Sequence, residues 1–318
     1  MKKISIITPC FNEELNVENC YLAVKKIMKA KLPNYSYEHI FADNASSDST
    51  FLVLEKIAKK DKNVKIILNS RNVGPFRNMW NAMKNATGDA IIPLLPADLQ
   101  DPAEIIPSLV KNWEKGDLVV YGVRSNRQEF WMMRFLRSIY YKLIRKFADA
   151  VIPLNSGEFL LADKLVIKSI LAVDDQYPYI RGLIAQTAVK SSSINYTWVK
   201  RKKGKSKNSF IDLIDQAING FVSTSRIPAR FALLFGFIFS IIGFIGAAIT
   251  FISFLLNKES VASGIPTIIV AIFLFGGIQL LFFGIIGEYI LSIHGQVRKS
   301  PPMFEIKKIN FKKEFKNE

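Results

Sequence analysis

Two long runs without a charged residue dominate the C-terminal third of the chain, residues 231–256 and 265–287. Each run is long enough to cross the roughly 30 Å hydrocarbon core of a bilayer as an α-helix. The link between them carries only Lys258 and Glu259, whereas basic residues precede the first run and follow the second. By the positive-inside rule, both ends of such a pair face the cytoplasm. The sequence therefore predicts a two-helix transmembrane hairpin, with helices over 231–256 and 265–291.

The composition agrees with a membrane protein that also has a soluble part. Hydrophobic residues make up 49% of the 318 residues, and the formal net charge is +16. Such a charge suits either a nucleic acid or the anionic cytoplasmic face of a membrane, and the apolar runs favour the membrane. We therefore expect a multi-pass protein of the inner (plasma) membrane, with its soluble part and both termini cytoplasmic and no nucleic-acid partner. The cysteines, Cys10 and Cys20, lack metal-ligand spacing, and the histidines, His39 and His294, are expected to be structural.

The N-terminal half alternates between two kinds of segment. Apolar runs rich in β-branched residues are separated by stretches with helical periodicity. The runs cover 4–8, 37–42, 64–68, 90–95 and 118–121, and the helical stretches cover 16–31, 49–60, 76–86 and 102–113. This alternation predicts an α/β domain with a mostly parallel sheet, in which ligands bind at the carboxyl ends of the strands.

One predicted strand leads directly into oxygen-bearing side chains. The run 90–95 is followed by Asp98, Gln100 and Asp101. In an extended chain Asp98 and Gln100 project from the same face, and their oxygens suit Mg²⁺ or Mn²⁺. The alternative is a strand followed by a capped helix, with Asp101 as the N-cap and Pro102 at the first helical position.

Polar motifs also follow the first two strands. Asn-Glu-Glu stands at 12–14, and residues 42–50 read Ala-Asp-Asn-Ala-Ser-Ser-Asp-Ser-Thr, in which Asp48 is expected to cap the next helix. In this order, and together with the segment around Asp98, the motifs resemble family 2 glycosyltransferases of the polyprenyl-phosphate (dolichol-phosphate) branch, which includes bactoprenol glucosyltransferases. The chain departs from the family pattern at Pro96, which replaces the first Asp of the metal segment, and at Asn44 and Ala45.

The resemblance implies a GT-A nucleotide-sugar domain over residues 1–207. Such an enzyme transfers a sugar, with inversion, from a UDP- or GDP-sugar to a polyprenyl phosphate in the lipid bilayer, using Mg²⁺ or Mn²⁺. The implied metal ligands are Asp98 and Gln100, and the implied catalytic residues are Asp98, Arg124 and Arg201. The positions matching the family's nucleotide-sugar contacts are Pro9, Phe11, Glu13, Ala42, Asp43, Ala97, Asp98, Arg124, Arg201 and Lys207.

Basic residues near the membrane complete the expected site. By resemblance, the basic loop 201–207 closes over the diphosphate, and the acceptor phosphate is bound by Arg124, Arg127, Arg134 and Ser138. Residues 129–148 mix aromatic and aliphatic residues with basic ones, which indicates an interfacial helix or, equally, an ordinary helix on the sheet. We further expect a juxtamembrane helix over 208–230 and a basic cytoplasmic tail over 292–318.

Two other functions fit parts of the sequence. A polysaccharide synthase would share the nucleotide half, but its Gln-x-x-Arg-Trp motif is absent. A catalytically weak or silent membrane scaffold is suggested by Pro96, although Mg²⁺ commonly needs only one or two protein carboxylates. A homo-oligomer is compatible with the sequence, which does not specify the sugar, the lipid length or the pathway.

Overall fold

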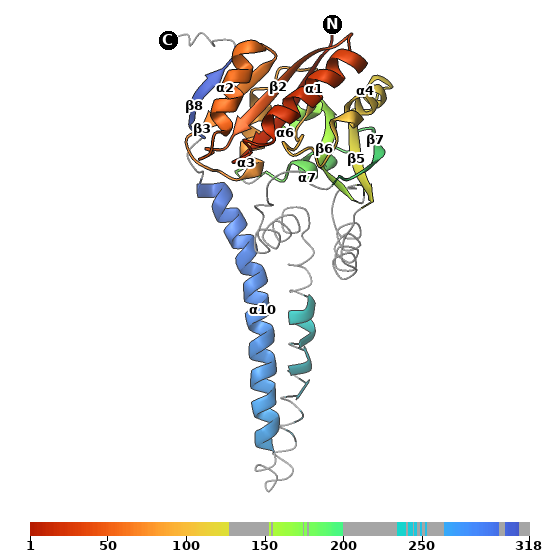
Figure 1. Ribbon diagram of the computed structural model, residues 1–318. Helices are drawn as coiled ribbons and strands as arrows, with labels where there is room; N and C mark the ends of the chain where they lie inside the picture. Colours follow the sequence, from red (N-terminus) through yellow and green to blue (C-terminus); the bar gives the residue numbers. More distant parts are fainter. Residues whose placement is uncertain are drawn as a thin grey trace.

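The computed structural model describes residues 1–126, 153, 155–173, 175–176, 178–199, 264–298 and 303–311, with short helical pieces between 234 and 252. Within this part, eight strands form one sheet in the order β7-β5-β6-β4-β1-β2-β3-β8 (Figure 1). β1 pairs in parallel with β2 and β4, β2 with β3, and β5 with β7, while β6 and β8 run antiparallel to their neighbours. The predicted GT-A-like α/β fold with a mostly parallel sheet is confirmed. The strands are β1 (Lys3–Cys10), β2 (Ser36–Asp43), β3 (Val64–Asn69), β4 (Ala90–Ile92), β5 (Val119–Asn126), β6 (Ser156–Asp163), β7 (Ser191–Thr197) and β8 (Glu305–Ile309).

Helices cover both faces of this sheet because the apolar residues of the strands alternate between the faces. Ile6 packs into one buried cluster and its neighbour Ile7 into the other. The cluster around Ile6 is covered by α1 (Val17–Lys31), α2 (Thr50–Lys60), the 3₁₀ turn η1 (Ala103–Ile105) and α4 (Ile106–Glu114). The cluster around Ile7 is covered by α3 (Pro75–Lys84), α6 (Lys164–Leu171) and α7 (Ile180–Gln186).

The fourth strand is shorter than the sequence suggests. The apolar run predicts a strand over 90–95, but β4 ends at Ile92. Pro93 follows, and a proline has no N–H to donate to a neighbouring strand. One further hydrogen bond, from Leu95 N to Ile7 O at 2.8 Å, keeps the segment beside β1. The chain therefore leaves the sheet before it reaches Asp98.

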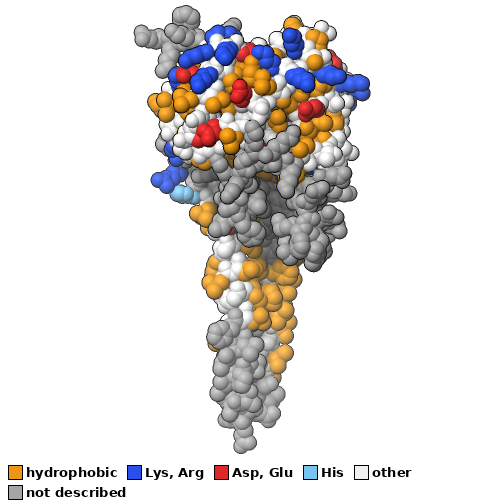
Figure 2. All heavy atoms as spheres, viewed as in Figure 1, with side chains coloured by type: hydrophobic (Ala, Val, Ile, Leu, Met, Phe, Trp, Pro, Cys, Tyr) orange, Lys and Arg blue, Asp and Glu red, His pale blue; other side chains and the backbone are white. Residues whose placement is uncertain are grey.

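The long helix α10 (Ile265–Arg298) extends away from the sheet (Figure 1). Over Leu274–Arg298 it is long and apolar enough to cross a membrane, and its hydrophobic side chains lie on the surface (Figure 2). It continues past the predicted end at 291. Of the first predicted span the structure describes only pieces, one of which places the Phe239 ring 6.2 Å from that of Phe275 in α10. The complete hairpin, like the helices predicted over 129–148 and 208–230, lies outside the described residues.

The sheet ends in a strand that the sequence analysis did not predict. Glu305–Ile309 falls within the stretch 292–318, which was expected to be a basic tail, yet it forms β8 and pairs with β3. The strand is short, and two of its residues are lysines, Lys307 and Lys308. Lysines are common on edge strands because they discourage pairing with other chains, but in a sequence they indicate a solvated tail just as well.

Candidate active site

The loops after β1 and β2 are tied together by hydrogen bonds at the carboxyl end of the sheet. Asn12 N donates to Ser46 Oγ at 2.9 Å, Asn12 Oδ1 accepts from Ser47 N at 2.7 Å, and Glu13 N donates to the hydroxyl of Thr50 at 2.8 Å. Asn12 has φ 54° and Ala45 has φ 61°, in the left-handed region. A glycine adopts this conformation without strain, and Ala45 stands where the family motif has glycine. The departure at Ala45 therefore keeps the backbone shape at some conformational cost.

The structure brings five of the predicted nucleotide contacts together here. Pro9 is opposite Ala42 in the register of β1 and β2, Phe11 and Glu13 follow β1, and Asp43 ends β2. Whether they touch a nucleotide stays a prediction.

Asp43 is the most unusual of these residues. Its side chain is fully buried, and Oδ1 accepts a hydrogen bond from Ser46 N at 2.9 Å. Its Oδ2 has no hydrogen-bond partner among the described residues. Burial raises the pKa of this carboxyl group, and the nearby Asp48 raises it further against the bonds from Ser46. A buried acceptor without a donor costs free energy, so Asp43 is suited to receive an N–H or O–H from a ligand.

Asp48 was predicted to cap α2, and it accepts a hydrogen bond at the start of this helix without occupying the N-cap position. Its Oδ1 accepts the N–H of Thr50, the first residue of α2, at 2.9 Å, although Ser49 occupies the N-cap position.

The segment of the predicted metal ligands is a turn, so the expectation of an extended chain is wrong. Leu99 has φ 56°, and its N–H donates to Pro96 O at 3.0 Å. Asp98 Oδ1 accepts from Gln100 N at 3.1 Å, as in an Asx turn. The described residues contain no group of three His, Cys, Asp or Glu side chains that could hold a metal ion. Asp98 and Gln100 stand on either side of Leu99 in this turn, which follows the buried Ala97, and their role as ligands stays a prediction.

Asp101 does not cap a helix, because its carboxylate is used elsewhere. It accepts two hydrogen bonds from Arg124, from Nε at 2.9 Å and from Nη2 at 2.7 Å, and one from the Tyr196 hydroxyl at 2.5 Å. Burial opposes the charge on Arg124, but Asp101 outweighs burial and raises the pKa of the guanidinium. A Cβ added at Gly157 would lie 3.1 Å from this guanidinium. Arg124 is thus held in a paired position, with only its remaining N–H groups available to a phosphate.

Glu158 is a further candidate that is not among the site residues predicted from the sequence. It lies near the start of β6, beside the end of β5, and Oε2 has no hydrogen-bond partner among the described residues. Burial raises the pKa of its carboxyl group, and Arg181, whose Nε lies 3.9 Å from Oε1, opposes the rise. The sequence offers one signal for Glu158: it stands where the family that the motifs resemble usually has Asp.

Five of the predicted site residues lie outside the described part of the chain. Nevertheless, the chain enters the basic loop 201–207 close to the turn of Asp98. Val199 N donates to Gln100 O at 3.0 Å, and the Arg124 guanidinium lies 5.9 Å from the Trp198 ring. The five residues are Arg127, Arg134, Ser138, Arg201 and Lys207.

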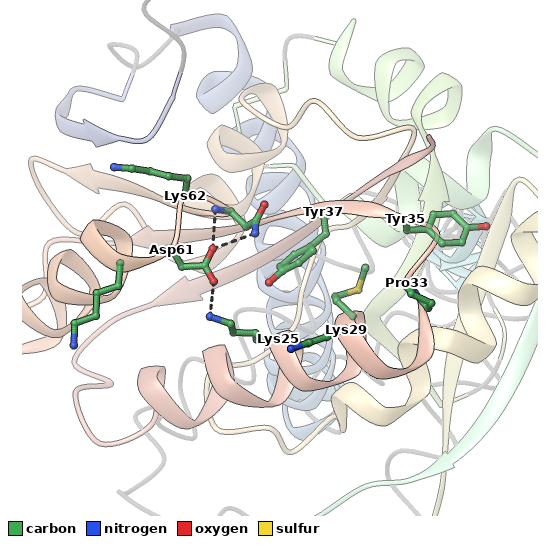
Figure 3. A pocket seen from close by; sticks show the side chains of 10 residues that line it. Lys25, Lys29, Pro33, Tyr35, Tyr37, Asp61 and Lys62 are labelled. Carbon is green, nitrogen blue, oxygen red and sulfur yellow. Dashed lines mark hydrogen bonds and ion pairs between the residues drawn. The ribbon is translucent and has the colours of Figure 1, made fainter.

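A separate cavity of about 520 Å³ lies at the amino ends of β2 and β3, away from this site (Figure 3). Four lysines and two tyrosines are among its lining residues, and Asp61 pairs with Lys25 at 3.0 Å. The buried His39 also belongs to the core: its Nε2 lies 2.9 Å from the Thr8 hydroxyl, and burial lowers its pKa to about 3. Cys10 and Cys20 are buried and not disulfide-bonded. None of these groups supplies the predicted chemistry.

Comparisons with known proteins identify the chain. The sequence model described as Glycosyl transferase family 2 matches residues 5–171. The SfII prophage-derived bactoprenol glucosyl transferase of Shigella flexneri is 31% identical, covering 96% of this chain and 98% of that protein. The uncharacterized glycosyltransferase YkcC of Bacillus subtilis is 32% identical, covering 93% of this chain and 91% of that protein.

A bactoprenol glucosyl transferase homologue from an Escherichia coli prophage is 30% identical, covering 94% of this chain and 97% of that protein. The crystal structure of glucosyl-3-phosphoglycerate synthase from Mycobacterium tuberculosis superposes with a TM-score of 0.49 at 16% identity, covering 68% of this chain and 75% of that one. This likeness is too weak to indicate an activity. The family match and the full-length relatives show that the chain is a glycosyltransferase that belongs to glycosyl transferase family 2.

Proposed function

We propose that this glycosyltransferase moves one sugar from a UDP- or GDP-sugar to a polyprenyl phosphate at the cytoplasmic face of the membrane. The observation that carries the proposal is Asp43 Oδ2, which has no hydrogen-bond partner among the described residues and lies at the carboxyl end of the parallel strands, where α/β sheets bind ligands. Uracil and guanine each have a ring N–H next to a carbonyl group. The free acceptor of Asp43 suits this N–H, so it favours a nucleotide donor.

We call the surroundings of Asp43 the nucleotide subsite. A divalent metal fits two other residues of the candidate site. Asp98 and Gln100 offer a carboxylate and an amide oxygen, and Mg²⁺ or Mn²⁺ takes its remaining ligands from diphosphate oxygens and water. When bound, the ion neutralises the charge that builds up on the leaving diphosphate. Arg201 and Lys207 would add positive charge there, because the chain enters their loop beside Gln100.

The acceptor follows from the chemistry and from α10. A phosphate monoester is already an anion near neutral pH, so its oxygen can attack the anomeric carbon without a strong base. The nucleoside diphosphate then leaves from the opposite face of the sugar, and the configuration inverts. α10 would keep a long lipid tail close to the site, and two curated relatives are named for bactoprenol. We assign the acceptor phosphate to Arg127, Arg134 and Ser138, with the free N–H groups of Arg124.

The test uses the purified full chain in detergent with radiolabelled UDP-glucose or GDP-mannose and undecaprenyl phosphate. The proposal predicts metal-dependent appearance of label in the lipid, lost in EDTA and in Asp98→Ala. Activity undiminished by EDTA would contradict the metal role, and label released only as free sugar would contradict the transfer to lipid.

A further inference from the structure

The C-terminal end of α10 is attached to the catalytic domain by side-chain hydrogen bonds. Gln296 Nε2 donates to Asp175 Oδ1 at 2.5 Å, and Gln296 Oε1 accepts from Gln176 N at 2.9 Å. A few residues later the chain enters β8, and Phe304 O accepts from Ser70 N at 2.9 Å. Ser70 directly follows β3, so this attachment is at the carboxyl end of the sheet, as is Asp43 at the end of β2.

Glu305, the first residue of β8, holds three side chains at this point. Its Oε1 accepts from Asn81 Nδ2 at 2.7 Å and from Asn85 Nδ2 at 3.2 Å, both in or next to α3. Its Oε2 lies 2.5 Å from Lys308 Nζ. The Glu305 side chain is only 17% exposed, so these bonds are shielded from water. Glu305 thereby fastens β8 to α3 as well as to β3.

A chain of asparagines continues from β8 to the residue beside Asp43. Asn69 is opposite Glu305 in the register of β3 and β8, and its Nδ2 donates to Asn78 Oδ1 at 2.8 Å and to Asn44 Oδ1 at 3.4 Å. Asn44 Oδ1 also accepts from Val73 N at 3.0 Å, which fixes the loop between β3 and α3. Asn78 sits in α3, and its Nδ2 donates to the carbonyl of the residue before Asp43 at 2.8 Å.

We propose that β8 is a strap between α10 and the nucleotide subsite, and that Glu305 is its positioning residue. Glu305 fixes α3 against β8, and α3 with Asn69 in turn fixes the loop around Val73 beside Asp43. The donor side of the site is therefore ordered by the segment that follows the membrane helix. The link to donor binding rests on the proposed function, whereas the ordering of the loop does not.

The first experiment is hydrogen–deuterium exchange on the full chain in detergent, with the amide of Val73 as the readout. Losing the bonds of Glu305 in Glu305→Ala should make this amide exchange about three- to tenfold faster, since such bonds contribute roughly 0.5 to 1.5 kcal/mol. Glu305→Gln keeps an acceptor for Asn81 and should restore slow exchange. Asn81→Ala removes the same bond from the α3 side and should reproduce the faster exchange.

Lys307→Ala is the matched control. It lies in the same strand, but its Nζ pairs with Glu55 of α2 at 2.6 Å, at a half-exposed position remote from the asparagines. The melting temperature of the Lys307→Ala variant measures how much stability the protein loses when β8 is weakened in general. Unchanged exchange at Val73 in both Glu305→Ala and Asn81→Ala, or an equal change in Lys307→Ala, would overturn the strap.

The second experiment measures the KM of each substrate. Glu305→Ala should raise the KM for the nucleotide sugar about three- to tenfold and leave the KM for polyprenyl phosphate unchanged, while Lys307→Ala changes neither. Faster exchange with an unchanged donor KM would overturn the link to the nucleotide subsite. If the unaltered chain transfers no sugar, the proposed function fails, and the exchange experiment still decides whether the strap exists.

Discussion

Among single residues, Asp43 combines complete burial with a carboxylate oxygen that no described group meets. Burial raises its pKa, so the ionised form is held in the folded protein at a cost in free energy. Such costs are common at functional sites, where they are offset when a ligand binds. At Asp43 the ligand would be the nucleotide base.

The first prediction is that Asp43→Asn weakens nucleotide binding without lowering the stability of the protein. Asn keeps an oxygen for Ser46 N but loses the charge, so UDP or GDP should bind at least about tenfold more weakly, while the melting temperature stays the same or rises. Binding to the unaltered chain should weaken as the pH falls through the raised pKa of Asp43, because the protonated carboxyl is a poor acceptor. Nucleotide titration by calorimetry at several pH values measures both effects.

Asp61→Asn is the control for this experiment. Asp61 is a buried carboxylate at the opposite end of the sheet, paired with Lys25. Its replacement should lower the melting temperature and leave nucleotide affinity unchanged. Equal affinity of Asp43→Asn and the unaltered chain for both nucleotides would remove Asp43 from the subsite.

At the scale of elements, Glu38 joins the amino ends of the central strands. Its carboxylate lies 2.8 Å from Lys3 Nζ of β1 and 2.6 Å from Lys65 Nζ of β3, and it accepts from Ser5 Oγ and Thr87 N. Burial alone would raise its pKa, but these partners lower it from 4.5 to about 2. The ionised form is therefore stabilised by folding.

The second prediction concerns acid stability. Because the folded pKa is depressed, Glu38 contributes stability above about pH 4.5, and this contribution is lost as the pH falls towards 2. Glu38→Gln should lower the free energy of unfolding at pH 7 by about 3 kcal/mol, the linkage value of this shift. Denaturation in detergent from pH 7 to pH 2 should show the difference shrinking through that window. Glu55→Gln, which removes solvent-exposed ion pairs, should have a much smaller effect, and an equal effect would contradict the account.

The sequence predicted the parallel core well because periodicity and burial agree there. The first three strands and the helices between them were expected within one or two residues of their observed bounds. The predicted element bounds were wrong where a proline, a left-handed residue or a pair of lysines departs from the apolar pattern of a strand. Pro93 ends β4 early, Leu99 turns the segment of Asp98, and the lysines of β8 made an edge strand resemble a tail.

The site was less predictable than the fold because partners distant in sequence decide the state of each side chain. From the sequence alone Asp101 is predicted to cap a helix, whereas in the structure its carboxylate accepts hydrogen bonds from Arg124 and Tyr196. Likewise, nothing local indicates that Glu158 and Asp43 each have a buried oxygen without a hydrogen-bond partner in the part of the chain that the structure describes. The family pattern identified the position of Asp43, and only the three-dimensional contacts show which partners each of these side chains has.

For the whole molecule, the position of α10 relative to the sheet matters, because α10 is the described helix long and apolar enough to cross a membrane. Gln296 contacts Asp175, and β8 begins beside Ser70, so α10 ends close to the carboxyl ends of the strands. A polyprenyl phosphate whose tail lies along α10 would thus reach the same edge as the nucleotide.

The third prediction tests whether α10 spans the membrane. Leu280 is 73% exposed in the middle of an apolar helix, and Arg at such a position opposes insertion by roughly 2.5 to 3.5 kcal/mol. One such Arg is outweighed by the apolar residues of the helix, so the test variant carries three substitutions, Ile272→Arg, Leu280→Arg and Phe283→Arg, at side chains that are 65%, 73% and 68% exposed. A protease-sensitive reporter after residue 318 should be cytoplasmic in the unaltered chain and external in this variant, in which only the first span inserts. Val297→Arg, at the end of the helix, should leave the reporter cytoplasmic. A cytoplasmic reporter in all three proteins would contradict the hairpin topology.

The central claim is that a lipid phosphate accepts the sugar, and one measurement tests it directly. The full chain is reconstituted into vesicles containing either undecaprenyl phosphate or undecaprenol, and a radiolabelled nucleotide sugar is added with Mg²⁺. Because the phosphate is the nucleophile, label should enter the organic phase only with undecaprenyl phosphate, with release of one nucleoside diphosphate per sugar transferred. Equal labelling of both lipids, or release of nucleotide without any labelled lipid, would contradict the account.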